Sequence, residues 1–144
     1  MPAQWTMVGN EQVYVVVDNL RKTLSTLDAS KPVVVGKVVE STSVLSRLFP
    51  SIGWRRLSLS AGVVLSTPAV QLLLNSCSSF WLPRSTERTL FYCAGELDIQ
   101  VIDPVDEEGN HLFHSKNVMD LISNSEKRRS ISGETQMLAS AAGL

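Results

Sequence analysis

The sequence lacks the features that mark several large classes of proteins. Its 144 residues include 13 basic and 14 acidic side chains, so the basic surplus that binding to nucleic acid or anionic membranes requires is missing. No run of about 20 apolar residues is present, and no segment is expected to cross a bilayer. The sequence contains no G-x-S-x-G, Walker or G-x-G-x-x-G motif and no internal repeats. These absences argue against a nucleic-acid partner and against several common enzyme classes.

Cysteine is scarce as well. Cys77 and Cys93 are the only two, too few for a disulfide scaffold and without the partners that a zinc site needs. A bridge between them would stabilise the chain by about 3 kcal/mol on the chain-entropy model, and it would require an oxidising compartment. The residues alone favour neither this bridge nor two separate buried thiols.

The composition that remains is that of a globular protein, with 44% apolar and 19% charged residues. Strand and helix patterns alternate along the chain, which predicts an α/β fold with a mostly parallel sheet. We expect a single domain over residues 1–122. From 123 to 144 the chain is rich in Ser, Lys and Arg, and we expect a tail without packed structure. The basic cluster 127–129 in that tail is interpreted as solvated rather than as a targeting signal.

Local patterns predict the individual elements. Apolar spacing predicts three helices. The first covers 19–28 with Asp18 as its N-cap, and the second begins after Thr67 as its cap. The third lies within 82–98. The third helix has Ser85 or Thr86 as its cap. Runs of β-branched residues predict strands, which cover 32–39, 58–66 and 98–103. The connection 40–57 has no clean period, and we expect it to be long and irregular, with room for one short strand.

A histidine pair near the end of the domain raises the question of a metal site. His111 and His114 lie three residues apart and follow an acidic run at 106–108. Imidazoles at this spacing share a face only in a helix, and Gly109-Asn110 between the two groups indicates a turn. We therefore favour a turn over a metal site in this segment.

Four segments of the chain, in the correct order, resemble glycosyltransferase family 31, in particular its core 1 β1,3-galactosyltransferase group and the chaperone homologue of that enzyme. They are "WTMVGNEQVYVVVDNL" (5–20), "KPVVVGKV" (31–38), "AGVVLS" (61–66) and "ERTLFYC" (87–93). A further segment, "DEEGNHLFHSKNV" (106–118), is similar to the chaperone homologue. The likeness covers roughly residues 5–122. It implies a partial GT-A-like (Rossmann-like) fold whose N-terminal half would lie upstream of this chain.

The resemblance also implies a site. In active members an acidic triplet binds Mn²⁺, which bridges to the diphosphate of UDP-galactose. The matching positions here are Asn10, Glu11 and Gln12, so two of the three carboxylates are amides and Glu11 is the surviving ligand. The general base of the family matches Glu87, whose extra methylene displaces the oxygens by about an ångström. A displacement of that size can cost on the order of a hundredfold in rate.

Compartment and partners follow from the same resemblance. It implies a Cys77–Cys93 disulfide and a setting in the ER or Golgi lumen, in a family that is usually type II membrane-anchored, with any anchor upstream of Met1. We expect a degenerate or partial galactosyltransferase-like protein of the O-glycan core 1 group. It would be catalytically weak or inactive and chaperone-like, and would bind a partner glycosyltransferase or a second copy. The alternatives are an active Mn²⁺-dependent enzyme that transfers galactose from UDP-galactose to O-linked GalNAc on a glycoprotein, and a non-functional fragment.

Overall fold

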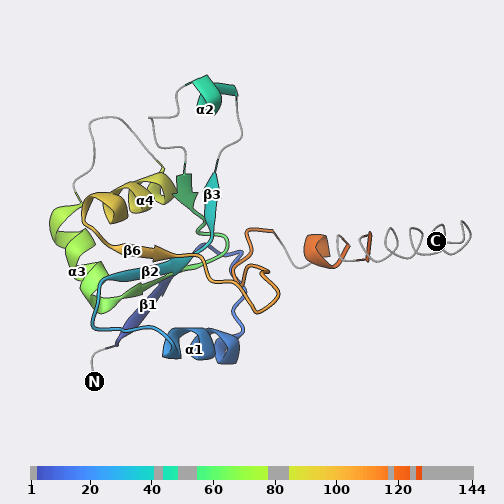
Figure 1. Ribbon diagram of the computed structural model, residues 1–144, viewed down its shortest axis with the longest axis horizontal. Coiled ribbons are helices and arrows are strands. Elements are labelled where there is room, and N and C mark those ends of the chain that lie inside the picture. Colours follow the sequence, from blue (N-terminus) through green and yellow to red (C-terminus); the bar gives the residue numbers. More distant parts are fainter. Residues whose placement is uncertain are drawn as a thin grey trace, which may run out of the picture.

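A four-stranded sheet forms the centre of the computed structural model, which describes residues 3–40, 44–48, 55–77, 85–116, 119–123 and 126–127 (Figure 1). In spatial order the strands are β1 (Trp5–Val8), β5 (Val63–Ser66), β2 (Val33–Gly36) and β6 (Gln100–Ile102). β5 pairs antiparallel with both β1 and β2, and β2 pairs parallel with β6. The α/β class predicted from the sequence is thereby confirmed.

The prediction of a mostly parallel sheet is wrong, because the sheet is mixed and its parallel pairing is the one between β2 and β6. Parallel neighbours need a crossover connection that packs on the sheet. Between β2 and β5 the chain instead forms a separate two-stranded antiparallel sheet of β3 (Val38–Glu40) and β4 (Arg55–Leu57). The chain reverses its direction between β3 and β4, so β5 runs antiparallel to β2 in the central sheet.

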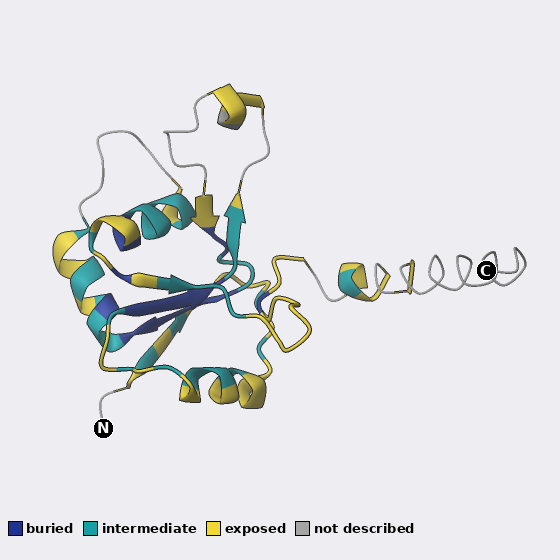
Figure 2. Ribbon diagram, viewed as in Figure 1, coloured by how far each residue is buried: buried dark blue, intermediate teal, exposed yellow. Residues whose placement is uncertain are grey.

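Helices lie on both faces of the sheet (Figure 1). One face carries Val34, Val63 and Leu65 and packs against α3 (Thr67–Ser76) and α4 (Thr86–Glu96). The other face packs against α1 (Val17–Ser25) and Phe113, and its buried strand residues are Val33, Val35 and Val64. The two central strands are apolar at nearly every position because both of their faces are covered. Figure 2 shows the buried residues concentrated in these strands.

The helix caps differ in part from the sequence predictions. α3 is capped by Ser66 and not by Thr67: the Ser66 hydroxyl accepts from the Ala69 N–H, while the Thr67 hydroxyl donates to the Ala3 carbonyl. α1 has Val16 at its N-cap, and Asp18 lies within its first turn, where its charge suits the helix dipole. Ser85 caps α4, which confirms one of the two predicted caps.

The segment 40–57 is more regular than predicted. It begins at the end of β3, contains the short helix α2 (Val44–Leu48), and ends in β4. Residues 41–43 and 49–54 lie outside the described part of the chain. Leu57 at the end of β4 is fully buried in the core under α3 and α4, which connects the small sheet to the body of the protein.

The C-terminal tail falls largely outside the description. Of the segment 123–144, for which we predicted no packed structure, the structure describes Ser123, Glu126 and Lys127, and each of them is helical. The remaining tail residues lie outside the described ranges. Within those ranges, none of the helices has the length and apolar character needed to cross a bilayer.

Candidate functional site

The turn between β4 and β5 brings together the two segments that the family resemblance singled out. Its Leu59 carbonyl accepts hydrogen bonds from the N–H groups of Gly62, at 3.1 Å, and of Asn10, at 3.3 Å. The Leu59 N–H donates to Oε1 of Glu87, at 2.8 Å. Gly62 has a φ of +81°, a conformation that favours glycine and lets the turn close. The polar triplet after β1 and the first turn of α4 therefore both hydrogen bond to the backbone of Leu59.

Asn10, Glu11 and Gln12 form an exposed turn between β1 and α1. Oδ1 of Asn10 accepts a hydrogen bond from the Gln12 N–H at 3.0 Å, and the Asn10 carbonyl accepts from the Val13 N–H at 3.2 Å. A side-chain oxygen of asparagine that closes its own turn is a common local motif. The Asn10 oxygen is thus already engaged within the chain.

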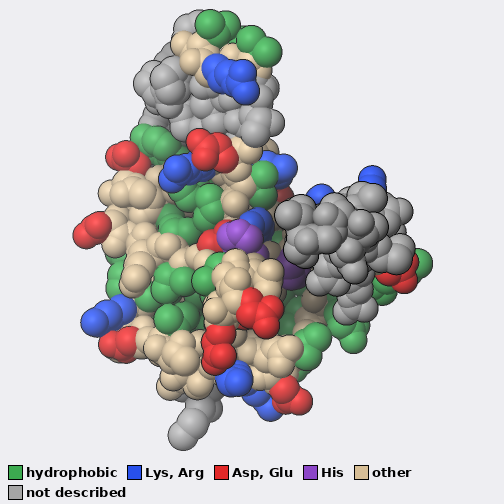
Figure 3. Space-filling view, turned by 45° about the vertical axis from the view of Figure 1, so that its right-hand side comes forward, with side chains coloured by type: hydrophobic (Ala, Val, Ile, Leu, Met, Phe, Trp, Pro, Cys, Tyr) green, Lys and Arg blue, Asp and Glu red, His purple; other side chains and the backbone are tan. Residues whose placement is uncertain are grey.

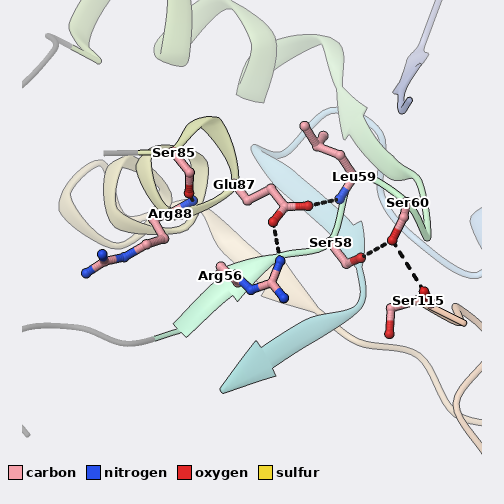
Figure 4. A network of polar contacts seen from close by, with 8 residues as sticks. All are labelled: Arg56, Ser58, Leu59, Ser60, Ser85, Glu87, Arg88 and Ser115. Carbon is pink, nitrogen blue, oxygen red and sulfur yellow. Dashed lines mark hydrogen bonds and ion pairs between the residues drawn. The ribbon is translucent and has the colours of Figure 1, made fainter. Parts of the chain in front are cut away.

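Glu87 lies in the first turn of α4, and the Ser85 hydroxyl caps this turn by accepting from the Arg88 N–H. One of its carboxylate oxygens accepts from the Leu59 N–H, and the other forms an ion pair with the Arg56 guanidinium from β4. Figure 4 shows this carboxylate between the two donors. Its side chain is 21% exposed. The contacts make Glu87 a tie between α4 and the β4–β5 turn.

A pocket opens beside this turn, with a volume of about 510 Å³. It is lined by polar and charged side chains: Gln12, Ser60, Ser115, Lys116 and Asp120. The Ser60 hydroxyl lies 2.9 Å from that of Ser58 and donates to the Ser115 carbonyl (Figure 4). The end of the triplet, the β4–β5 turn and the segment after His114 therefore share one hydrophilic hollow.

A divalent cation fits these residues poorly. Mn²⁺ is held by several anionic oxygen ligands, and the triplet offers the single carboxylate of Glu11 beside two amides. Within the described ranges, no three His, Cys, Asp or Glu side chains come together in a way that could hold a metal ion. The chemistry of this donor set does not match the metal site that the resemblance implies.

Asp103 organises a second polar cluster that sequence reasoning missed. Its carboxylate accepts from the Val38 N–H at 3.2 Å and lies 3.6 Å from Nζ of Lys37 and 3.0 Å from Nδ1 of His111. Figure 3 shows histidine, acidic and basic side chains together on one face of the molecule. Asp103 and Lys37 follow the carboxyl ends of the parallel strands β6 and β2. Because polar side chains at such strand ends often form sites, their position after two predicted strands could have indicated this cluster from the sequence. His111 therefore contacts Asp103 at the sheet edge.

Cys77 and Cys93 form a disulfide, with their Cα atoms 5.6 Å apart. Cys77 is the C-cap residue of α3, and Cys93 lies buried in α4. The bond thus joins the two helices that cover one face of the sheet. This confirms the pairing that the resemblance implied and that the residues alone left open.

The comparison with known families adds no identity. No protein-family model matches the chain. The resemblance to glycosyltransferase family 31 rests on the ordered motifs in the sequence alone.

Proposed function

We propose that this protein is a degenerate or partial relative of the family 31 β1,3-galactosyltransferases of the O-glycan core 1 group, catalytically weak or inactive and chaperone-like. The proposal includes a partial GT-A-like fold and a setting in the ER or Golgi lumen. The mixed α/β sheet is compatible with a partial GT-A-like fold. The Cys77–Cys93 disulfide is compatible with the ER or Golgi lumen, because disulfides persist in oxidising compartments.

The contacts of the Glu87 carboxylate with Leu59 and Arg56 are the observation that carries the proposal. A general base needs an oxygen within reach of the acceptor hydroxyl and free to take its proton. Here one oxygen accepts from the Leu59 N–H and the other is paired with Arg56. Both oxygens of the carboxylate are therefore held by donors of the protein itself, through charge-assisted contacts. The position that matches the catalytic base thus has a structural role.

The triplet supports the same conclusion. Replacement of two carboxylates by Asn10 and Gln12 removes the charge that would hold Mn²⁺ and offset the diphosphate. Purified protein is expected to show no rise in melting temperature with MnCl₂ and UDP-galactose together, and no transfer of galactose to a GalNAc-bearing peptide. A ligand at 100 times its Kd would add about 2.7 kcal/mol, a shift of several degrees.

A matched variant makes the binding test specific. Asn10→Asp combined with Gln12→Asp restores the carboxylates on an exposed turn, and this variant is expected to gain a Mn²⁺-dependent shift with UDP-galactose. Asn10→Ser with Gln12→Ser changes the same positions without charge and serves as the control. A manganese-dependent shift and turnover by the unaltered protein would contradict the proposal.

The chaperone-like part of the proposal requires an apolar docking surface for a partner glycosyltransferase. The short helix α2 carries Val44, Leu45 and Leu48, and these residues are 72%, 57% and 65% exposed. In Figure 1 this helix stands apart from the central sheet. Exposed apolar side chains gathered on one element are typical of protein-binding sites.

Co-expression tests this part directly. The protein is expected to raise the active yield of a core 1 galactosyltransferase produced in the same cells, and Leu45→Asp is expected to abolish the gain. Leu74→Asp, on the exposed side of α3, serves as the control, because Leu74 is 81% exposed and lies on another element. An unchanged yield with the unaltered protein would overturn the chaperone role and leave the catalytic conclusion standing.

One observation favours a second candidate, an active Mn²⁺-dependent galactosyltransferase. Asn10 of the triplet and Glu87 both hydrogen bond to the backbone of Leu59, so the residues that match the metal motif and the base lie beside the same β4–β5 turn, as catalysis would require. The transfer assay above distinguishes the two candidates, since the second predicts product formation that depends on manganese.

A further inference from the structure

The outer edge of β1 presents backbone groups that lack partners among the described residues. Neighbours in an antiparallel pair alternate between hydrogen-bonded and non-bonded positions. The Thr67 N–H donates to the Gln4 carbonyl, and the register pairs Thr6 with Leu65 and Val8 with Val63. Residues 4, 6 and 8 therefore direct their backbone groups toward β5. Trp5 and Met7 direct their N–H and C=O groups away from the sheet.

The side chains of β1 do not protect this edge. Natural edge strands usually avoid pairing with other chains by carrying charged residues, proline or a bulge. β1 reads Trp-Thr-Met-Val, with no charge and no proline, and its register with β5 is continuous. Trp5 and Met7 pack toward α1, while Thr6 and Val8 are exposed on the opposite face, Val8 at 44%. β1 is thus an uncharged strand open to pairing.

We propose that two copies of this chain pair through β1, antiparallel about a two-fold axis at Thr6, to form one sheet that continues through both copies. This inference goes beyond the proposed function and does not depend on it. Under that symmetry Trp5 of one copy lies opposite Met7 of the other. Every outward N–H then meets an outward C=O, so the edge is complementary to itself. The formal net charge of −1 opposes such an association little.

The pairing also covers the exposed side chains of the strand. The Thr6 side chains of the two copies lie opposite each other at a non-bonded position, where the side chains of an antiparallel pair come closest. A four-residue strand offers a smaller contact than a standard protein interface. We therefore expect a dimer that depends on concentration, with a Kd of roughly micromolar or weaker.

Charge exchange at the axis tests the geometry. Sedimentation velocity of the full chain from about 1 to about 300 µM is expected to show a monomer that converts to a dimer, a range that brackets the expected Kd. Thr6→Lys and Thr6→Glu each place like charges in contact across the axis, and each variant is expected to remain monomeric. An equimolar mixture of the two is expected to form the heterodimer. Thr6→Val serves as the control and is expected to dimerise as the unaltered chain does.

A backbone variant tests the hydrogen bonds. Met7→Pro removes an N–H that points away from β5, and it is expected to weaken the dimer at least tenfold while far-UV circular dichroism stays unchanged. A chain that stays monomeric at every concentration would overturn the proposal. It would also be overturned by dimers of Thr6→Lys as tight as those of the unaltered chain, or by a lysine and glutamate mixture that stays monomeric. Monomers that bind a partner transferase through the same edge would assign β1 to that partner and equally overturn self-pairing.

Discussion

At the residue scale, the polar side chains of greatest interest bind the protein's own backbone. Glu87 accepts from the Leu59 N–H, Asp103 from the Val38 N–H, and Asp106 from the Asn110 N–H. Each contact ties a turn or a strand end that lacks regular partners. The N–H groups of Leu59 and Val38 are half-buried, and such a group left without an acceptor is costly, so Glu87 and Asp103 contribute to the fold whatever else they do.

Asp106 yields a pH prediction. The Asn110 side-chain hydrogen bond, together with the backbone N–H groups of Asn110, Glu108 and Gly109, holds the pKa of Asp106 below its ordinary value. Because the folded pKa is lower than the unfolded one, the turn's contribution to stability is complete above the unfolded value of about 3.9 and is lost as pH falls through the folded value. We expect the NMR signals of the Gly109 and Asn110 amides to stay constant from about pH 7 to 5 and to move toward random-coil positions below about pH 4.

A substitution separates this effect from general acid unfolding. In Asp106→Ala the same two amides are expected to lie near random-coil positions already at neutral pH, while the amides of β2 and β5 keep their native shifts. Native positions of Gly109 and Asn110 in this variant would show that Asp106 does not organise the turn.

At the scale of elements, the protein depends on connections between helices and strands that are distant in sequence. The disulfide joins α3 to α4, the Glu87–Arg56 pair joins α4 to β4, and Ser66 joins β5 to the start of β2 through the Val33 N–H. Each connection reaches the face of the sheet that α3 and α4 cover. We expect this face to lose order together when one of these connections is cut.

Loss of the disulfide is the clearest case. The cysteines are 16 residues apart, and a loop of this length corresponds to about 3 kcal/mol on the chain-entropy model. Urea unfolding is expected to show that loss on addition of reductant. The double variant Cys77→Ser, Cys93→Ser is expected to have the lower unfolding free energy even without reductant, and addition of reductant is expected to leave it unchanged. Equal stability of the oxidised and reduced protein would contradict this account.

At the scale of the whole molecule, two apolar clusters on opposite faces of one sheet hold the fold together. The strands β2 and β5 contribute to both, since their successive side chains point to opposite faces. Leu57 extends one cluster into β4 and so attaches the small sheet to the large one. The position of the β4–β5 turn, and with it the candidate site, depends on that attachment.

Alanine substitutions at one buried and one exposed leucine test whether Leu57 attaches the small sheet to the large one. Leu57 is 0% exposed, and Leu57→Ala is expected to cost about 2–5 kcal/mol of unfolding free energy. Leu48→Ala on α2 makes the same chemical change at a residue that is 65% exposed, and its unfolding free energy is expected to stay within about 0.5 kcal/mol of that of the unaltered chain. Similar losses for both variants, measured by urea unfolding, would show that Leu57 does not anchor β4.

The sequence by itself determined the α/β class, the buried strands around 33–36 and 63–66, and a helix cap at Ser85 or Thr86, between which the structure chose Ser85. These features follow from the order of residues along the chain: runs of β-branched side chains, and a hydroxyl just before an apolar helical repeat. It left open whether the cysteines pair, since spacing alone does not bring two thiols together.

Only the tertiary structure decided the direction of β5, the pairing of Glu87 with Leu59 and Arg56, and the cluster around Asp103. Glu87 and Arg56 are 31 positions apart, and Asp103 and Val38 are 65 apart. No local period records contacts over such distances, because they arise when packing of the apolar faces brings the strand ends together.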